Sequence, residues 1–339
     1  MRVSQGRQHA ARPTSAADGQ SVFAGWVTQT SYRNYSPGKR RVFYVRRGRR
    51  QGKRWGSPAR ISAGHGRVDY PQLAASAGSV YAIWTNADTG DIRFATSTNQ
   101  GGSWSIETIG TTTSGIGSKE GYRGLPSVGT SGSNVLVTWF TNDSGTQVAK
   151  VSNNGGGDLA GAGETTLTGS SPNDGIHFAQ ARGADDGASN DVVVAYTTAT
   201  GLAVRTYDGS SLGPERAVLG PWPQTVHQID YDGSYGPAVQ PYGSGGLLVG
   251  FPGCRAVSLV NDCNNANPGA RIDLLFSESV NGGAAWTVPE RLADSTATYR
   301  TNDAASITYS ASRRYVSYNE WNSKYTAYDV AMRVGSGTP

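Results

Sequence analysis

The sequence predicts an all-β fold of six repeated units, each a sheet of four antiparallel strands. The 339 residues include 46 Gly and only two Met, with apolar residues in short Val-rich runs, a composition typical of short strands joined by turns. No long stretch has helical periodicity. In addition, an alternating segment that ends in an aromatic residue recurs six times, 55 to 67 residues apart. This spacing accommodates four short strands and their turns.

The recurring segment is the second strand, B, of each unit. A strand A precedes it, as at Pro71–Ser76 and Pro126–Thr130, and a strand C follows it, as at Ile92–Thr96 and Leu274–Ser277. A strand D completes the unit. The six copies of strand B are Ser21–Trp26, Ser79–Trp84, Asn134–Trp139, Asp191–Tyr196, Gly246–Phe251 and Arg313–Tyr318.

Stacked units of this kind predict a six-bladed β-propeller that forms one domain over residues 1–339. The last unit lacks a strand D, and we expect residues 1–6 to pair with it and close the ring, which removes an exposed edge. The predicted blades are residues 12–62, 70–110, 122–168, 177–219, 235–293 and 299–335.

A turn motif, S-x-N-x-G-x-S-W, joins strands C and D. It is complete in Ser97–Trp104 and nearly so in Ser279–Trp286, while Ser152–Leu159 lacks the Trp and the first unit keeps only Gly52 and Trp55. The Asn side chain can bond the amides of its own turn, and the aromatic residue returns to the root of the hairpin. We expect Gly101 and Gly102 to supply the positive φ of the reversal.

This motif resembles the Asp-box, or BNR repeat, of the sialidase-like β-propellers, with Asn in place of the usual Asp. The resemblance covers nearly the whole chain and implies architecture more strongly than activity. In a four-stranded blade the A–B and C–D turns lie at one end, here called the scaffold end. The B–C and D–A loops lie at the other, here called the site end, where a binding site is expected.

Polar and aromatic residues gather in the loops predicted for the site end. All four histidines, His9, His65, His177 and His227, precede an A strand. Six tryptophans end B strands or anchor C–D turns, and the remaining two, Trp222 and Trp321, fall in predicted site-end loops, where a sugar ring could stack on them. The long excursions, 27–41, 110–123, 220–236 and 252–270, are site-end loops as well.

Tyr122-Arg123-Gly-Leu-Pro126 is similar to the sialidase Tyr/Phe-Arg-Ile-Pro signature with one residue added. In that family the Arg helps to hold the substrate carboxylate, a task that suits its planar fork. The pattern departs from a true sialidase, because the loop after Arg12 lacks the acid/base Asp and only Asp143 follows Arg123 at a plausible place. The chain is therefore not assigned as a sialidase.

We expect a carbohydrate-active protein, foremost a glycoside hydrolase acting on an acidic or branched glycan. One alternative is a non-catalytic, lectin-like propeller, and another is a polysaccharide lyase that uses a His and a Tyr. The residues could also be structural, as turn caps, loop hydrogen bonds or inter-blade ion pairs. Candidate catalytic residues are Asp69, Asp230, Asp232, Tyr235 and His177. Candidate substrate-binding residues are Arg123, Arg300, Tyr122, His65, His227, Trp222 and Trp321.

Cys254 and Cys263, the only cysteines, bracket one irregular segment, which favours a disulfide over two free thiols. Neither they nor any other pattern predicts a metal site or a cofactor. The start at Met1 has no apolar core of a signal peptide. The cysteine pair nevertheless favours a secreted protein whose leader is absent, and no apolar run is long enough to cross a membrane.

The net charge of +5 is concentrated in the basic strip Lys39–Arg54, which holds nine Lys or Arg and no acid, so the rest of the chain carries 5 − 9 = −4. We interpret the strip first as protection of a blade edge. A polyanion, such as an acidic polysaccharide or nucleic acid, is the alternative partner, with nucleic acid least favoured. We expect a monomer.

Overall fold

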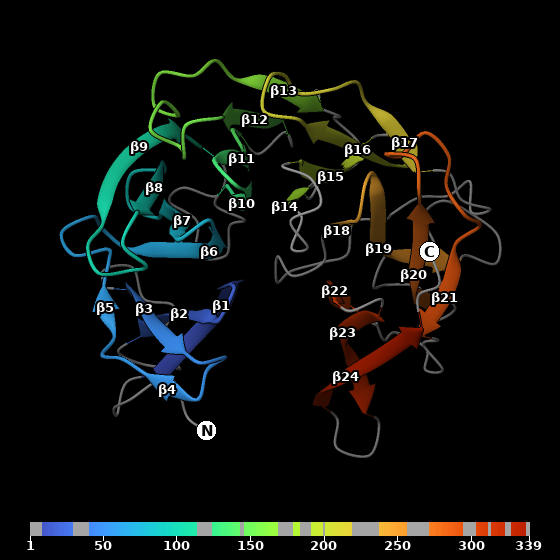
Figure 1. Cartoon of the computed structure of the whole chain (residues 1–339), viewed down its shortest axis with the longest axis horizontal. Coiled ribbons are helices and arrows are strands. Elements are labelled where there is room, and N and C mark those ends of the chain that lie inside the picture. The colour runs from blue at the N-terminus through green and yellow to red at the C-terminus, as the bar shows by residue number, and fades with distance from the viewer. Residues whose placement is uncertain are drawn as a thin grey trace. The chain divides into compact units, whose positions relative to one another are not determined.

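The computed structural model describes residues 9–29, 41–113, 124–142, 146–168, 179–183, 191–198, 201–218, 237–255, 271–293, 303–310, 313–322 and 327–336. From residue 303 onward, and at some strand ends before it, the description is limited to the backbone. The chain forms two compact units, Met1–Gly169 and Ser170–Pro339. The described residues of both units form antiparallel sheets (Figure 1). These residues contain no helix that is long and apolar enough to span a membrane.

In the first unit the described residues form three sheets, and in each the strands follow one another in chain order. The first is β1 (His9–Asp18), β2 (Ser21–Gln29) and β3 (Val42–Arg49), with β4 (Arg54–Trp55) and β5 (Ala59–Arg60) both along β3. The second is β6 (Val68–Ser76), β7 (Ser79–Asn86), β8 (Asp91–Ser97) and β9 (Ser105–Thr111). The third is β10 (Ser127–Ser131), β11 (Asn134–Phe140), β12 (Gln147–Ser152) and β13 (Thr165–Thr168).

The described residues of the second unit repeat this arrangement. Its sheets are β14 (Ala179–Gly183), β15 (Val192–Thr198), β16 (Gly201–Tyr207) and β17 (Arg216–Val218); β18 (Ala238–Tyr242), β19 (Gly246–Arg255), β20 (Arg271–Ser279) and β21 (Glu290–Ala293); and β22 (Asp303–Ser310), β23 (Arg313–Asn322) and β24 (Ala327–Ser336). The prediction of four-stranded antiparallel sheets is confirmed for the second to fifth sheets, while the described residues of the first sheet form five strands and those of the sixth form three. Residues 1–6, the predicted closing strand, lie outside the described residues, so the closure of a ring stays a prediction.

The B strands are buried on both faces where neighbouring sheets pack against them. Every residue of β11 is buried, as is every residue of β7 after its first, which explains their nearly continuous apolar sequence. Between the first and second sheets, Phe43 of β3 meets Trp84 of β7 edge to face, with ring centroids 5.9 Å apart. Both side chains are almost fully buried, and such a pair adds about 1 kcal/mol to the effect of burial.

Neighbouring A strands of the first unit are also joined by hydrogen bonds. The Leu73 amide of β6 donates to the hydroxyl of Thr14 in β1 at 3.0 Å. The Gly132 amide, after β10, donates to the hydroxyl of Ser76 in β6 at 2.8 Å. These bonds connect successive sheets through groups that the strand ladders leave available.

The three C–D turns with the predicted motif are built alike. In the first, the Asn99 side-chain oxygen accepts hydrogen bonds from the Ser97 hydroxyl at 2.9 Å and the Ser103 amide at 2.8 Å, and the Ser97 oxygen accepts one from the Gly101 amide at 2.8 Å. Trp104 packs against the core between the first and second sheets. Asn154 and Asn281 accept the corresponding serine hydroxyl at 2.8 and 2.9 Å.

The positive φ predicted for Gly102 is wrong. The reversal is made one residue earlier, by Gln100 (φ 58°) and Gly101 (φ 85°). Gly102 has another reason to be glycine, because a Cβ there would lie 3.1 Å from the Asn99 side-chain oxygen. The third sheet makes the same reversal with Gly155 and Gly156.

The C–D turns lie beside the A–B turns of their own sheets, as the four-stranded unit predicts. The Gln51 amide donates to the Gln20 carbonyl at 2.9 Å, and the Gly155 amide donates to the Ser133 carbonyl at 2.9 Å. These backbone bonds define the scaffold end of the first and third sheets. The opposite end of each sheet is where its A and C strands begin and its B strand ends.

Candidate functional site

Strand β6 has a β-bulge near its first residues, at the site end of the second sheet. The register with β7 shifts between Asp69 and Gln72, so that Tyr70 and Pro71 together lie opposite the single residue Trp84. Tyr70 has a φ of 47°, a left-handed conformation that is unusual for a bulky residue. Bulges of this kind redirect side chains and are over-represented beside active sites.

The same register shift recurs opposite the aromatic residue of two other B strands. It lies between Ala11 and Thr14 in β1 and between Asp303 and Ser306 in β22. Asp303 therefore occupies in the sixth sheet the strand position that Asp69 occupies in the second. The bulge is thus a repeated feature of the A strands at their site end.

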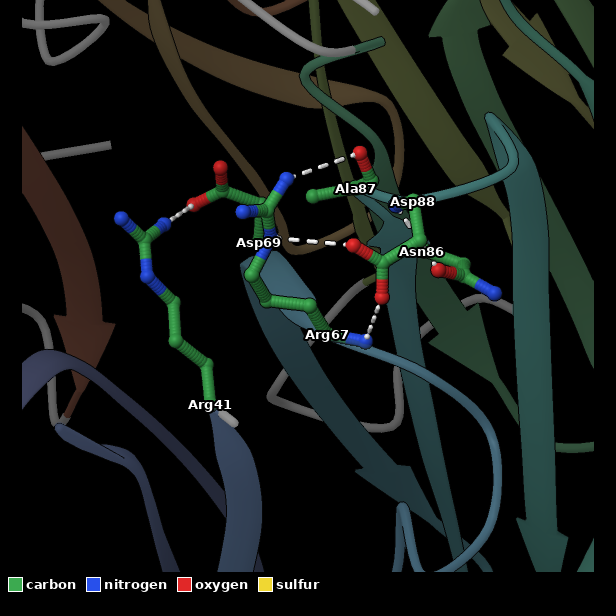
Figure 2. Close-up of polar contacts among 6 residues, drawn as sticks. All are labelled: Arg41, Arg67, Asp69, Asn86, Ala87 and Asp88. Atoms are coloured by element: carbon green, nitrogen blue, oxygen red, sulfur yellow. Dashed lines mark hydrogen bonds and ion pairs between the residues drawn. The ribbon is translucent and has the colours of Figure 1, made fainter. Parts of the chain in front are cut away.

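Asp69 forms a buried ion pair with Arg41 of the neighbouring sheet (Figure 2). A guanidinium nitrogen of Arg41 lies 3.1 Å from a carboxylate oxygen of Asp69, and the two side chains are 10% and 0% exposed. Arg41 immediately precedes β3, and its carbonyl accepts a hydrogen bond from the Val68 amide at 3.2 Å. Backbone and side chains therefore join the start of the first sheet's C strand to the start of the second sheet's A strand.

A second ion pair joins Arg67 to Asp88 in the B–C turn of the second sheet (Figure 2). The Arg67 Nε lies 3.3 Å from one carboxylate oxygen of Asp88, and the Arg67 amide donates to the other oxygen at 2.9 Å. The Arg67 guanidinium also donates to the Ala87 carbonyl at 3.2 Å. The Asp88 amide in turn donates to the Asn86 side-chain oxygen at 3.0 Å, so the D–A loop is bound tightly to the B–C turn.

His65 lies in the D–A loop that these contacts hold. Its amide donates to the Ser62 carbonyl at 3.1 Å, and the residue is partly exposed. The next residue, Gly66, has a φ of 75°, and a Cβ there would lie 2.4 Å from the Asn86 side-chain oxygen. Only glycine allows this approach, so Gly66 fixes the position of the loop that carries His65.

The arrangement limits what Asp69 can do as it stands. A general acid or base must come within hydrogen-bonding distance of the group whose proton it moves, whereas the Asp69 side chain has no exposed surface and is paired with Arg41. In this conformation Asp69 orients the guanidinium of Arg41. Its predicted catalytic role stays a prediction.

Tyr196, the aromatic residue near the end of strand β15 in the fourth sheet, has a carboxylate partner. Tyr196 donates from its hydroxyl to Glu215 at 2.7 Å. Burial raises the pKa of the Tyr196 hydroxyl above its usual value, and the bond to Glu215 raises this pKa further. Tyr196 is therefore held in the neutral, donating form.

Most of the predicted site residues lie outside the described residues: Tyr122, Arg123, His177, Trp222, His227, Asp230, Asp232, Tyr235 and Arg300. Cys263 also lies outside them, and Cys254 is described by its backbone, opposite Ile272, so the disulfide stays a prediction. The prediction that Trp321 falls in a loop is wrong, because β23 extends to Asn322 and pairs Trp321 with Tyr328. Residues 252–255, predicted to begin a loop, likewise continue β19.

Sequence reasoning did not single out Arg41, Arg67 or Asp88 as members of the site. Arg41 was grouped with the basic strip, although its position just before strand C already implies the site end. Asp88 could have been identified as a site-end residue from its place in a short B–C turn. The pairing of either residue across the sheets has no signature in a single sequence.

No protein-family model matches the chain, and no curated protein matches its sequence. Among solved structures, the fold is similar to a mutant α-L-arabinofuranosidase from Fusarium graminearum in complex with an iminosugar inhibitor, with a TM-score of 0.51, 13% identity, and coverage of 96% of this chain and 93% of that one. It is also similar to an endosialidase of phage phi92, with a TM-score of 0.50, 8% identity, and coverage of 98% and 68%.

A Hadza microbial sialidase matches with a TM-score of 0.47 and 12% identity over 91% of this chain. The match spans 63% of that sialidase, less than two thirds of its length. At these identities the likeness concerns the fold. The chain therefore shares its fold with the arabinofuranosidase and the endosialidase, which is consistent with the predicted β-propeller.

Proposed function

We propose that this protein is a glycoside hydrolase of the sialidase-like propeller type that acts on an acidic or branched glycan. The observation that carries the proposal is the β-bulge at the start of β6, which recurs at the site end of the first and sixth sheets. The fold that this protein shares with an arabinofuranosidase and an endosialidase also supports hydrolysis of a glycosidic bond. Fold alone does not assign an activity, so the site must be tested by substitution.

The roles proposed for the site residues follow from the ion pair that Arg41 and Asp69 already form. Because Asp69 is engaged with Arg41, we assign the acid and base to Asp230 and Asp232, with Tyr235 and His177 as further proton-transfer candidates. Asp69 and Arg41 hold the site ends of the first two sheets together, while Arg123 and Arg300 bind an acidic substrate. His65, Tyr122, His227, Trp222 and Trp321 contact the sugar rings.

The proposal also covers the domain as a whole, its C–D turns and its two cysteines. We propose that the six sheets close into one propeller domain over residues 1–339, with residues 1–6 as the last strand. The C–D turns are then Asp-box repeats at the scaffold end. Cys254 and Cys263 form a disulfide in a secreted, monomeric protein.

The test is release of reducing ends from a panel of arabinans, mannans, sialylated glycans and uronic-acid polymers. We expect Asp230→Asn or Asp232→Asn to reduce the rate at least 100-fold, in keeping with the typical contribution of a general acid or base. Asp208→Asn is the matched control, because Asp208 is exposed in the C–D turn of the fourth sheet and should leave activity unchanged. Unchanged release by every site variant excludes the assignment.

A lectin-like propeller is the second candidate, and the burial of Asp69 against Arg41 favours it, because such a carboxylate can shape a binding site without moving a proton. It predicts retention of a glycan with no product after long incubation. Trp222→Ala should then abolish retention. A new absorbance from an unsaturated uronate product would instead identify a lyase.

A further inference from the structure

Four exposed cations surround the hairpin between β3 and β4 at the scaffold end of the first sheet. They are Arg49, Arg50, Lys53 and Arg54, here called the basic tip. Among the described residues no ion pair involves any of them. The basic tip is therefore a concentrated positive charge that its described surroundings leave without a partner, and it lies away from the site end.

The charges of the basic tip are placed where they oppose the local structure. Arg49 lies directly opposite Arg54 in the ladder of β3 and β4, and like charges at such positions are destabilising. Arg50 and Gln51 both adopt a left-handed backbone, with φ of 52° and 55°, which costs about 1–2 kcal/mol for a residue with a side chain. Features that conflict with the fold in this way are expected at functional sites.

The basic tip is nevertheless held in a defined conformation. The Gln51 amide donates to the Gln20 carbonyl at 2.9 Å, and the Lys53 amide donates to the Arg50 carbonyl at 3.2 Å. Edge protection accounts for charges along an outer strand. It does not account for Arg50 and Lys53, which lie in the turn beyond the paired strands.

The chemistry around the basic tip selects among polyanions. Single-stranded nucleic acids are bound through aromatic side chains on which bases stack, but Trp55 lies against its own hairpin, where a Cβ on Gly48 would come within 3.1 Å of the ring. Insertion into a membrane requires exposed apolar residues. The exposed large apolar residues among those described, Val280 and Val288, belong to the fifth sheet.

We infer that the basic tip is a docking surface for an acidic polysaccharide, separate from the proposed hydrolytic site. Its cations bind sulfate or carboxylate groups along the polymer and release condensed counterions, so binding weakens steeply with salt. The inference does not depend on hydrolysis, because the basic tip lies at the scaffold end.

The test measures binding to two probes, heparin and polygalacturonate, and to duplex DNA for comparison. Each is titrated between about 50 and 200 mM salt, which spans the range where such binding weakens by orders of magnitude. The variant combines Arg49→Gln, Arg50→Asn, Lys53→Gln and Arg54→Gln, with Asn chosen because it tolerates a left-handed backbone. We expect binding of at least one probe to weaken at least tenfold. We also expect the slope of log affinity against log salt to fall by about two to three, given up to about 0.9 per contact for duplex DNA.

Two controls test whether binding depends on the place of the cations and on their charge. Arg60→Gln removes an exposed cation of the same sheet on β5 and should weaken binding less than twofold. The triple variant Arg49→Lys, Arg50→Lys and Arg54→Lys keeps the charge and should retain binding, because counterion release depends on charge.

Three results would overturn the inference. The first is that the natural protein binds neither probe at 50 mM salt. The second is that the quadruple variant binds heparin and polygalacturonate as tightly as the natural protein does. The third is tighter binding to duplex DNA than to both polysaccharides, which would assign the basic tip to nucleic acid instead.

Discussion

Arg41 and Asp69 meet 3.1 Å apart between the start of β3 and the start of β6, almost fully removed from solvent. They bring together two sheets of the first unit at the end where the A strand bulges. A buried ion pair is costly to break from one side, because the remaining charge has lost its compensation. The pair therefore makes the site end of these two sheets dependent on both residues.

We predict that Arg41→Met or Asp69→Asn lowers the free energy of unfolding by about 3–5 kcal/mol. The double substitution Arg41→Met with Asp69→Asn should cost less than the sum of the two single substitutions, because neither charge is left unpaired. Urea denaturation gives the free energy of unfolding of the natural protein, the two single variants and the double variant. Arg67→Met is the control and should cost less than about 1 kcal/mol, since its partner Asp88 is 51% exposed. Equal costs for Arg41 and Arg67 would contradict the importance of the buried pair.

The C–D turn of the second sheet depends on a side-chain oxygen of Asn99. Asn99→Ala removes the acceptor for the Ser97 hydroxyl and the Ser103 amide and should cost about 1–2 kcal/mol. Asn99→Asp keeps these acceptors and should cost less than half as much. Thermal unfolding of both variants compares them directly, and an equal loss would show that the acceptor is not what holds the turn.

Gly156 combines a left-handed backbone with a close contact to the neighbouring sheet. Its φ is 85°, and a Cβ there would lie 2.6 Å from the ring of Phe94. Gly156→Ala should therefore destabilise the protein by about 2–4 kcal/mol through backbone strain and overpacking. Gly163→Ala is the matched control, since a Cβ there meets nothing within 4 Å. Similar unfolding midpoints for the two variants would exclude this account.

Glu107 makes the stability of the folded protein depend on pH, and the direction of this dependence follows from its pKa. Burial raises the pKa of its carboxyl above the usual value, the Asp158 charge raises this pKa further, and Lys150 opposes both. A raised folded-state pKa contributes stability that is complete below the unfolded pKa near 4.5 and is lost as pH rises through the folded value.

Glu107→Gln should accordingly gain stability relative to the natural protein between pH 4 and pH 7, by less than about 1 kcal/mol because the group is partly exposed. Unfolding midpoints at the two pH values provide the measurement. The exposed Glu164, replaced by Gln, should show no such gain. A relative loss of stability for Glu107→Gln at pH 7 would contradict the direction of the shift.

Features with local causes were predictable from the sequence. The Asn99 turn follows from a side-chain oxygen that accepts hydrogen bonds from donors two residues before it and four residues after it. The buried Trp84 near the end of β7 follows from the recurring strand pattern. The positive φ was predicted at Gly102 and lies instead at Gln100 and Gly101, because a glycine can be required by a close contact as well as by its φ. Trp321 was placed in a loop because the length of β23 depends on its pairing with β24.

The candidate site was less predictable, because its contacts join residues distant in sequence. Asp69 is one of the candidate catalytic residues that the sequence predicts, but nothing near it in the chain indicates Arg41 as its partner. Arg41 belongs both to the predicted site-end loop 27–41 and to the basic strip Lys39–Arg54, so the sequence alone does not assign it to one of them. The register of strand C, which the structure supplies, is what separates Arg41 from Arg49 and Arg54.

The measurement that tests the central claim most directly is hydrogen exchange of backbone amides, with and without an oligosaccharide that the protein cleaves or retains. The site end of the second sheet should be protected, so exchange should slow at residues 65–70 and 85–88. Exchange at the C–D turns, residues 99–103, 152–156 and 279–283, should not change. Slower exchange at these turns, with none around Asp69, would contradict the assignment of the site to the opposite end.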